Sequence, residues 1–364
     1  MDNQTIPVIS HIHIKQFRCF KEHTITCDAP LVLIQGANGT GKTSIVEALY
    51  YACYLRSFRT NTPRELVTDN TDAFCVKVMV RTSDQTDEIS IGFSDKKRLV
   101  KINQQAISSY KSLLSYYRVI AITEDDIDLI KEGPSYRRDF LDQALTLVDA
   151  TYITAFKRMR DTLEQRNKVL QTGACDPDLY AVWTQQLWER SIPLQKQRIQ
   201  LLKEIQKEVN CLIQIYFASE FKVSFFYEPK KMDVHQSFEA FQQENPTLYQ
   251  DELRFRRSLF GAHVDTINIT FKGKKSRSFA SRGQQKLLVI LIKAAQIRLL
   301  AGLSHTPLIL LLDDFMTDFD SDRANTLIQL LQDLHIQLIF TAPLGGYLEQ
   351  ELEKRGAYMV KLSL

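Results

Sequence analysis

One segment of this chain limits its possible folds more than any other. A short apolar run at Leu31–Ile34 is followed by a glycine-rich loop and then by an amphipathic helix pattern from Ser44 to about Tyr54. The loop, Gly36–Thr43, satisfies the pattern G-x-x-x-x-G-K-S/T. Glycines at this spacing let backbone N–H groups converge on phosphate oxygens, and the helix N-terminus adds the positive end of its dipole. We therefore predict a buried strand, a phosphate-binding loop and a helix, in that order.

Such a loop predicts a nucleotide site for ATP with Mg²⁺. The Lys42 ammonium would contact the β- and γ-phosphates, and the Thr43 hydroxyl would be a ligand of Mg²⁺. The alternative is a glycine turn that carries a lysine by chance. The residues of the loop that we expect to bind ATP are Gly36, Ala37, Asn38, Gly39, Thr40, Gly41, Lys42 and Thr43.

A second acidic element suits the same site. Five apolar residues, Leu308–Leu312, precede Asp313 and Asp314, which is the pattern of a Walker B strand. Asp313 would belong to the Mg²⁺ shell, and Asp314 would orient or deprotonate the attacking water. The predicted catalytic residues are therefore Lys42, Asp313 and Asp314, and the predicted metal ligands are Thr43 and Asp313. Acids after a strand can instead cap the next helix, an alternative that is stronger for Asp320.

Elsewhere the first hundred residues show mainly strand patterns. Apolar and polar residues alternate at 9–17, and segments with strand character follow at 23–27, 74–80, 88–93 and 98–102. We expect the last three to form an antiparallel set, because polar turns join them.

The middle of the chain has a helical period instead. Apolar positions three or four residues apart predict one long amphipathic helix from Tyr152 and a second from near Trp183 to Leu212, with a turn at 173–177. Pro193 is predicted to bend or interrupt the second helix. Nothing in this helical hairpin resembles a catalytic site.

Strand patterns return after about residue 254. Strands at 266–271, 308–312 and 336–340 alternate with helices at 281–300 and 321–334, which predicts a parallel sheet. A length of 364 residues favours about two domains. We therefore expect the two ends of the chain to form one α/β domain that a helical insertion interrupts.

The segment Ser281–Gln285 opens the predicted helix at 281–300 and resembles the signature sequence of ATP-binding-cassette (ABC) ATPases. In that family the signature serine and glycine bind the γ-phosphate of the nucleotide held by the partner subunit. The resemblance implies that two chains sandwich two ATP molecules. A simple helix cap is the alternative for this segment. The residues that the resemblance assigns to ATP binding are Ser281, Arg282, Gly283 and Gln284.

The order of several motifs along the chain resembles the RecF family of SMC-like ATPases. These motifs are Ile14–Arg18, Gly36–Thr43, Arg56–Thr60, Gly133–Asp142, Leu163–Asn167, Trp183–Leu187, Phe279–Gln285 and Leu311–Asp314. The resemblance implies an ATP-dependent homodimer that binds DNA at gaps and stalled forks and works with RecO and RecR to load the RecA recombinase, in replication restart and the SOS response. It also implies a weak DNA-dependent ATPase.

The predicted fold class follows from the loop, the strand order and the resemblance. It is α/β: an ABC-type P-loop ATPase head, with a mixed sheet and helices, and an inserted helical lobe. The head would comprise residues 1–120 and 248–364, and the arm or lid would comprise residues 121–247.

Three segments depart from the family pattern. Gly261–Asp265 lacks an arginine and one acid, so His263 and Asp265 either line the site or serve packing. Thr123–Asp125 lacks the proline of the family motif, which puts a γ-phosphate-sensing role there in doubt. Thr341 stands where ABC transporters carry a switch histidine, and because threonine cannot titrate near neutrality, we expect slow hydrolysis.

Composition excludes several classes of protein. The chain has no apolar run of about 18 residues and no basic-then-apolar leader, so we expect a cytoplasmic protein without a membrane partner. Its six cysteines form no CxxC pair, which favours reduced thiols over a metal or redox site.

The net charge of +3 does not indicate a nucleic-acid partner, so DNA contacts would need a locally basic surface that reads the backbone. Each candidate cluster is alternatively an ordinary solvated face. The clusters are Lys15 with Arg18, Arg56 with Arg59, Lys96–Arg98 with Lys101, Arg254–Arg257, and Lys272 with Lys274, Lys275 and Arg277.

Three other functions are compatible with the loop. A P-loop phosphotransferase would need neither the signature helix nor an ATP-induced dimer. A DNA-binding protein with a vestigial ATP site would bind DNA equally well with and without ATP. Another SMC-like ATPase, such as a nuclease of that group, would normally carry a coiled-coil arm or a nuclease domain, which 364 residues do not accommodate here.

Overall fold

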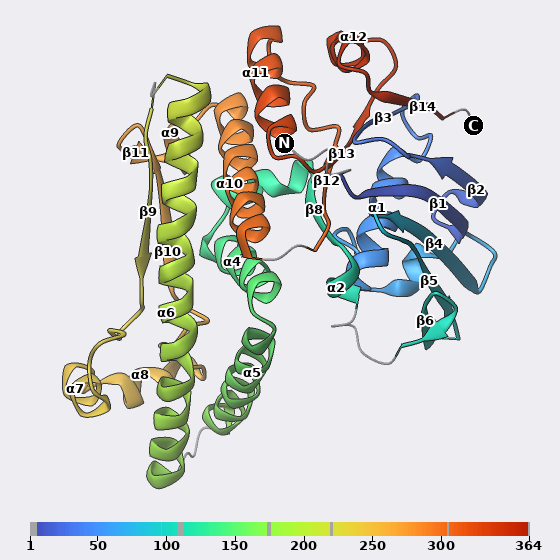
Figure 1. Ribbon diagram of the computed structural model, residues 1–364. Coiled ribbons are helices and arrows are strands. Elements are labelled where there is room, and N and C mark those ends of the chain that lie inside the picture. Colours follow the sequence, from blue (N-terminus) through green and yellow to red (C-terminus); the bar gives the residue numbers. More distant parts are fainter. Residues whose placement is uncertain are drawn as a thin grey trace. The chain divides into compact units, whose positions relative to one another are not determined.

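The computed structural model describes residues 6–95, 97–107, 113–172, 176–218, 221–303 and 306–362 (Figure 1). The chain divides into two compact units: unit 1 comprises Met1–Ile127 and Leu300–Leu364, and unit 2 comprises Asp128–Leu299. Both ends of the chain thus contribute to unit 1. The compact units change over near residues 127 and 299, whereas the predicted domains change over near 120 and 247. Compact units are not the same thing as the predicted ATPase head and arm, so the predicted limits of these two domains stay a prediction.

Unit 1 contains a parallel sheet of five strands in the order β14-β3-β13-β12-β8 among the described residues. The strands are β3 (Leu31–Gln35), β8 (Arg118–Ile122), β12 (Leu308–Asp313), β13 (Gln337–Ala342) and β14 (Tyr358–Lys361). Every residue of β3, β12 and β13 is buried, as their continuous apolar runs require of strands covered on both faces. The predicted parallel sheet is confirmed for the strands predicted at 308–312 and 336–340. The strand predicted at 266–271 does not belong to it, because that segment pairs antiparallel with residues 223–228 in unit 2. The predictions did not include β8 or β14.

The second sheet of unit 1 is antiparallel, with six described strands in the order β2-β1-β4-β5-β6-β7. Buried and exposed residues alternate along β4, because one face of this sheet is covered. The predicted antiparallel set is confirmed. Its strands are β1 (Val8–Phe17), β2 (Phe20–Thr26), β4 (Ala73–Arg81), β5 (Thr86–Ser94), β6 (Lys97–Ile102) and β7 (Gln105–Ala106).

Helix α1 (Lys42–Tyr54) packs against strands of both sheets, including β4 of the antiparallel sheet and β8 of the parallel one. It is buried all round, except at Thr43, whose side chain is partly exposed. A helix covered on every side is held by packing rather than by propensity. The other helices of unit 1 are α2 (Leu113–Tyr116), α11 (Ser321–Gln332) and α12 (Tyr347–Lys354), with 3₁₀ turns at Pro63–Leu66 and Glu124–Ile127.

Unit 2 is mainly helical but also holds a small antiparallel sheet, β11-β10-β9. Its two long predicted helices are confirmed as α5 (Ala150–Gln171) and α6 (Pro177–Tyr216), and α6 continues through Pro193 without a break (Figure 1). Most of the turn predicted at 173–177 lies outside the described residues. The remaining elements are α3 (Asp128–Lys131), α4 (Pro134–Val148), β9 (Val223–Glu228), α7 (Phe238–Glu244), α8 (Leu248–Phe255), β10 (Thr266–Phe271), β11 (Lys274–Lys275), α9 (Ser276–Phe279) and α10 (Arg282–Leu303), whose last turn belongs to unit 1.

Two buried arginines organise the core of unit 2. Arg166 pairs with the carboxylate of Glu252 at 2.5 Å, and Arg198 makes a bidentate pair with Asp142, with both N–O distances 2.8 Å. Arg198 also donates to the carbonyl of Ala262 at 2.5 Å. Buried charges of this kind are tolerated only when they are paired and hydrogen-bonded. In the described part of the chain, none of the helices combines the length and apolarity that a bilayer crossing requires.

Candidate functional site

The glycine-rich loop lies at the carboxyl end of β3 and leads directly into α1 (Figure 1). Gly41 is the N-cap of α1 and has a φ of 92°, which favours glycine. A Cβ atom at Gly41 would lie 2.5 Å from the ring of Phe20 and 2.7 Å from the Cys19 sulfur. A Cβ at Gly36 would lie 2.3 Å from the Thr40 hydroxyl. The loop therefore keeps its shape only with glycine at these positions.

The Lys42 side chain folds back over this loop. Only 5% of the residue is exposed, and its ammonium donates to the carbonyls of Gly36, at 2.9 Å, and Ala37, at 3.2 Å. Both acceptors are neutral, and no carboxylate lies within ion-pair distance of Lys42 in the described residues. A phosphate oxygen would be a stronger acceptor for this ammonium, because hydrogen bonds between charged groups are stronger than those to neutral carbonyls.

The Walker B acids lie at the same edge of the sheet. Strand β13 separates β3 from β12, and Thr341 on β13 is in register with Ile34 and with Asp313. The carboxyl ends of parallel strands meet at one edge, so Asp313 and the loop that follows β3 share that edge. Asp313 is buried, and Asp314 has a φ of 50°, a left-handed conformation that aspartate tolerates.

Thr341 links the two acids. Its hydroxyl donates to Asp313 Oδ1 at 2.8 Å and accepts from the backbone N–H of Asp314 at 2.9 Å. The hydroxyl therefore fixes both the orientation of the carboxylate and the sharp turn after β12. Asp320, by contrast, caps α11 by accepting from the N–H of Arg323 at 2.9 Å, so the helix-cap alternative is confirmed for Asp320.

Glu47 is a site residue that the sequence predictions missed. Its carboxylate is fully buried in α1 and accepts from Arg18 at 2.7 and 2.8 Å and from the hydroxyl of Ser57, and Arg59 lies at 3.6 Å. The hydrogen bond to Glu47 raises the pKa of Arg18, although burial opposes it. The clue in the sequence is a glutamate on the apolar face of the helix, where a carboxylate requires a partner. Arg18 and Arg59, two of the candidate DNA-binding residues, are thus engaged beside the loop.

The Thr123 segment follows β8, the neighbour of β12, and serves as a local cap. Asp126 accepts from the Thr123 backbone N–H at 2.8 Å and from its hydroxyl at 3.3 Å. The Asp126 N–H donates back to the Thr123 carbonyl at 3.0 Å, which closes a 3₁₀ turn. The segment therefore keeps its turn without the proline of the family motif.

The signature residues lie in unit 2, where they begin α10. The Ser281 hydroxyl accepts from the N–H of Gln284 at 3.4 Å, and the Gln284 side chain accepts from the N–H of Ser281 at 3.0 Å. This reciprocal pair is a capping box. The cap alternative is thus confirmed, and the ATP-binding role of Ser281–Gln284 stays a prediction. Gly283 has nothing within 4 Å of the position that a Cβ would occupy, so packing within the chain does not require a glycine there.

His263 and Asp265 belong to the interior of unit 2. Asp265 is fully buried and accepts from the Gln195 amide at 2.9 Å and from the N–H of Lys230 at 3.0 Å. Burial raises the pKa of Asp265, and burial also lowers the pKa of His263 to about 4. Within unit 2 the packing interpretation fits both residues.

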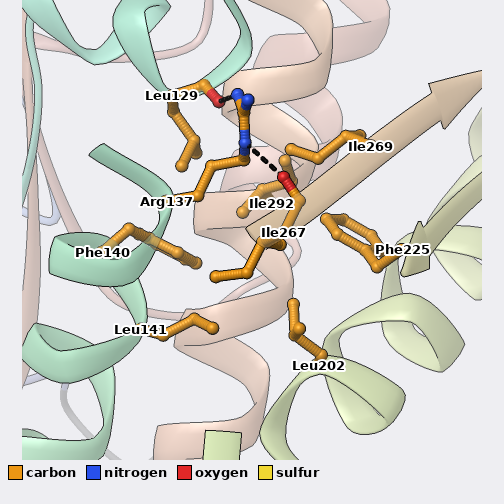
Figure 2. Close-up of a pocket in the computed structure, with 9 residues that line it drawn as sticks. All are labelled: Leu129, Arg137, Phe140, Leu141, Leu202, Phe225, Ile267, Ile269 and Ile292. Carbon is orange, nitrogen blue, oxygen red and sulfur yellow. Dashed lines mark hydrogen bonds between the residues drawn. The ribbon is translucent and has the colours of Figure 1, made fainter. Parts of the chain in front are cut away.

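A small pocket in unit 2 is lined almost entirely by apolar side chains (Figure 2). Its polar group, the Arg137 guanidinium, is occupied by the carbonyls of Ile267, at 2.7 Å, and Leu129, at 2.8 Å. Burial, and secondarily the charge of Arg277, lower the pKa of Arg137. This apolar lining does not suit a phosphate group, which favours the backbone N–H groups of the Gly36–Thr43 loop in unit 1 as the phosphate-binding site.

Comparisons with known proteins agree with this geometry. The model of a family described as an AAA domain matches residues 11–247. A DNA replication and repair protein RecF from Halothermothrix orenii is 30% identical over 92% of this chain and 92% of its own length. The chain belongs to the RecF family. The RecF protein of Acholeplasma laidlawii is similarly related, at 28% identity over 94% of this chain and 96% of the relative.

Solved structures show the same fold. The structure of the recombination mediator protein RecF with ATP, from the RecFOR pathway, has a TM-score of 0.81 and 24% identity, with 94% of both chains covered. An Smc head domain from Pyrococcus furiosus has a TM-score of 0.56 and 13% identity. The predicted α/β head of the ABC and SMC type is therefore confirmed as the fold of this RecF-family chain.

Proposed function

We propose that this chain is an ATP-dependent recombination and repair mediator that dimerises on ATP and binds DNA at gaps and stalled forks. With RecO and RecR it would promote RecA loading in the cytoplasm, during replication restart and the SOS response. The observation that carries the proposal is a juxtaposition at the carboxyl ends of the parallel strands. There the Gly36–Thr43 loop follows β3 and Asp313 ends β12, and β13 lies between these two strands. The name of the solved RecF–ATP structure supports ATP as the ligand.

The residues of the loop suit the triphosphate of ATP. Backbone N–H groups of Gly36–Thr43 and the N-terminus of α1 would surround the phosphates, and Lys42 would exchange its two carbonyl acceptors for β- and γ-phosphate oxygens. No large movement is required, because the Lys42 ammonium already lies against the loop. The loop would therefore bind ATP in nearly its present shape.

Mg²⁺ fits the donor set at this edge, since Thr43 offers a hydroxyl and Asp313 a carboxylate oxygen, both hard oxygen ligands. When bound, the ion would neutralise charge on the phosphates. Thr341 would hold Asp313 in position, and Asp314 would orient or deprotonate the attacking water. Because Thr341 cannot carry a proton to the site, we propose a weak, DNA-dependent ATPase.

Ser281–Gln284 would contact the γ-phosphate held by the partner subunit, and the open space at Gly283 supports this role. ATP should therefore convert monomers into dimers, as measured by sedimentation velocity with and without saturating ATP. Ser281→Arg, at an exposed position, should retain ATP binding and lose the dimer. A wild-type protein that stays monomeric at saturating ATP would contradict the clamp model.

Thr341→Val tests how the acids are positioned. Valine has nearly the same shape as threonine but removes the hydroxyl that bonds Asp313 and Asp314. We expect ATP turnover to fall about five- to thirtyfold, with a much smaller change in KM, because one or two hydrogen bonds of about 1 kcal/mol each are lost next to the reacting groups.

Thr341→Ser keeps the hydroxyl and should restore most of the turnover lost in Thr341→Val. Steady-state phosphate release gives kcat and KM separately for the three proteins. A higher kcat for the serine variant than for the valine variant would assign the effect to the hydroxyl, which only serine keeps. Equal kcat values in the two variants would show that the hydroxyl has no positioning role.

A further inference from the structure

The stretch of residues 266–312 contains no aspartate or glutamate, in a chain whose net charge is only +3. Three of its cations are engaged by other residues: Lys286 is buried, Lys293 lies 5.6 Å from the ring centre of Phe140, and Arg298, although exposed, pairs with Glu208 at 3.2 Å. The other five are exposed. The eight lysines and arginines of this stretch are Lys272, Lys274, Lys275, Arg277, Arg282, Lys286, Lys293 and Arg298.

Four of the exposed cations lie on one hairpin and in the short helix that follows it: Lys272, Lys274 and Lys275 belong to the β10–β11 hairpin, and Arg277 belongs to α9. We call these four residues the basic tip. Strands β10 and β11 are joined by the two residues Lys272 and Gly273, both with positive φ, at 52° and 75°. This is the geometry of a tight two-residue hairpin. The buried Ser276 hydroxyl donates to the carbonyl of Ile269 at 2.9 Å and holds the returning segment on the sheet. This hydrogen bond ties the backbone between Lys275 and Arg277 to β10.

No carboxylate lies within ion-pair distance of the basic tip in the described part of the chain. The Lys274 ammonium instead lies 4.6 Å from the ring centre of Phe279, which is 60% exposed. Arg277 also faces the buried Arg137 closely enough to lower the pKa of Arg137 further. Like charges held together without counter-charges raise the energy of the free protein, and a bound polyanion removes that cost.

We infer that the basic tip binds the phosphate backbone of DNA. The inference rests on the proposed function, since it names the DNA-contacting surface of a protein proposed to bind DNA. Cations gathered on the hairpin and on α9 can contact successive phosphates, and the exposed ring of Phe279 beside them gives an unpaired base a surface for stacking. Gapped DNA supplies both features.

The other aromatic and basic cluster of unit 2 fits this role less well. It has three cations, Arg254, Arg256 and Arg257, against the four of the basic tip. It also does not lie in an acid-free stretch, although the adjacent Asp251 and Glu252 are engaged with Lys231 and Arg166. The two clusters lie toward opposite ends of unit 2 (Figure 1). The basic tip also precedes Ser281 directly in the chain, so bound DNA would contact the segment that begins α10.

The test compares two variants of the full chain, one that loses the four positive charges of the basic tip and a control that loses three positive charges elsewhere in unit 2. The tip variant combines Lys272→Asn, Lys274→Gln, Lys275→Gln and Arg277→Gln, with asparagine at 272 because it tolerates the left-handed conformation. The control combines Arg254→Gln, Arg256→Gln and Arg257→Gln. Fluorescence anisotropy with a gapped duplex, over a salt series at saturating ATP, gives the affinity and its salt dependence.

We expect the tip variant to bind gapped DNA at least about tenfold more weakly at 0.1 M salt. The magnitude of the slope of log K against log salt should fall by up to about 3.6, because up to four phosphate contacts are lost at about 0.9 each. The control should keep nearly the wild-type slope. Both variants should bind a fluorescent ATP analogue as the wild type does, which would show that the fold and the nucleotide site are intact.

Two outcomes would overturn the inference. One is a tip variant with wild-type affinity and slope. The other is wild-type binding to phosphatidylserine vesicles that the tip variant loses while its DNA binding is unchanged, which would assign the tip to anionic lipid. A wild-type protein that does not bind DNA at all would instead refute the proposed function, so the two failures are distinguishable.

Discussion

Replacing Lys42 with methionine is expected to weaken ATP binding by about a hundredfold and to abolish ATP-induced dimerisation. The ammonium already lies against the loop, where it donates to the carbonyls of Gly36 and Ala37. In the ATP complex it would make charge-assisted bonds to phosphate oxygens, and two such bonds together contribute about 3 kcal/mol. That energy corresponds to about two decades in Kd. Methionine fills a similar volume but cannot donate a hydrogen bond.

Titration with a fluorescent ATP analogue measures this loss, and circular dichroism checks that the fold is kept. Lys21→Met is a matched control, because Lys21 is an exposed lysine on β2 of the same unit. If Lys42→Met binds the analogue as the wild type does, the Gly36–Thr43 loop is not the nucleotide site. If its DNA affinity equals that of the wild type with and without ATP, the vestigial-site alternative is favoured.

The local elements of the nucleotide site could be predicted from the sequence. A short buried strand, a loop with glycines at fixed positions and a helix leave little freedom. The structure differs in extending the strand from Ile34 to Gln35 and in starting α1 at Lys42 rather than Ser44. Strands β12 and β13 were also predicted within two residues, because their continuous apolar runs require burial on both faces.

Contacts between distant segments could not be predicted in this way. The bond from Thr341 to Asp313 depends on the register of two strands, and the Glu47 cluster depends on the Arg18 turn folding over α1. A sequence pattern gives the period of each element but not its neighbours. Strand β9 was missed, because its partner β10 begins far along the chain.

Pro193 shows tertiary packing overriding a local rule. The proline removes one backbone N–H and was expected to bend or break the helix, yet α6 runs from Pro177 to Tyr216 without a break. Pro193 is exposed, while Leu194, Gln195 and Arg198 after it are buried. Burial of these side chains stabilises the helix on both sides of the proline.

Arg198→Met is expected to destabilise unit 2 by about 3–5 kcal/mol. Arg198 is 1% exposed, and its guanidinium pairs with Asp142, bonds the carbonyl of Ala262 and lies 3.9 Å from Asp265. Removing one partner of a buried ion pair leaves the other charge without compensation. This lowers the free energy of unfolding more than replacing both partners with apolar residues would. Methionine preserves much of the packing volume, so the loss would reflect charge rather than a cavity.

Urea unfolding followed by tryptophan fluorescence is the measurement, because both tryptophans of the chain, Trp183 and Trp188, lie in α6 and report on unit 2. Lys196→Met, at an exposed position of the same helix, should change the free energy of unfolding by less than about 0.5 kcal/mol. Adding Asp142→Asn to Arg198→Met should recover part of the loss, since the uncompensated carboxylate is then gone. A loss below about 1 kcal/mol for Arg198→Met alone would mean that this pair does not hold the core of unit 2 together.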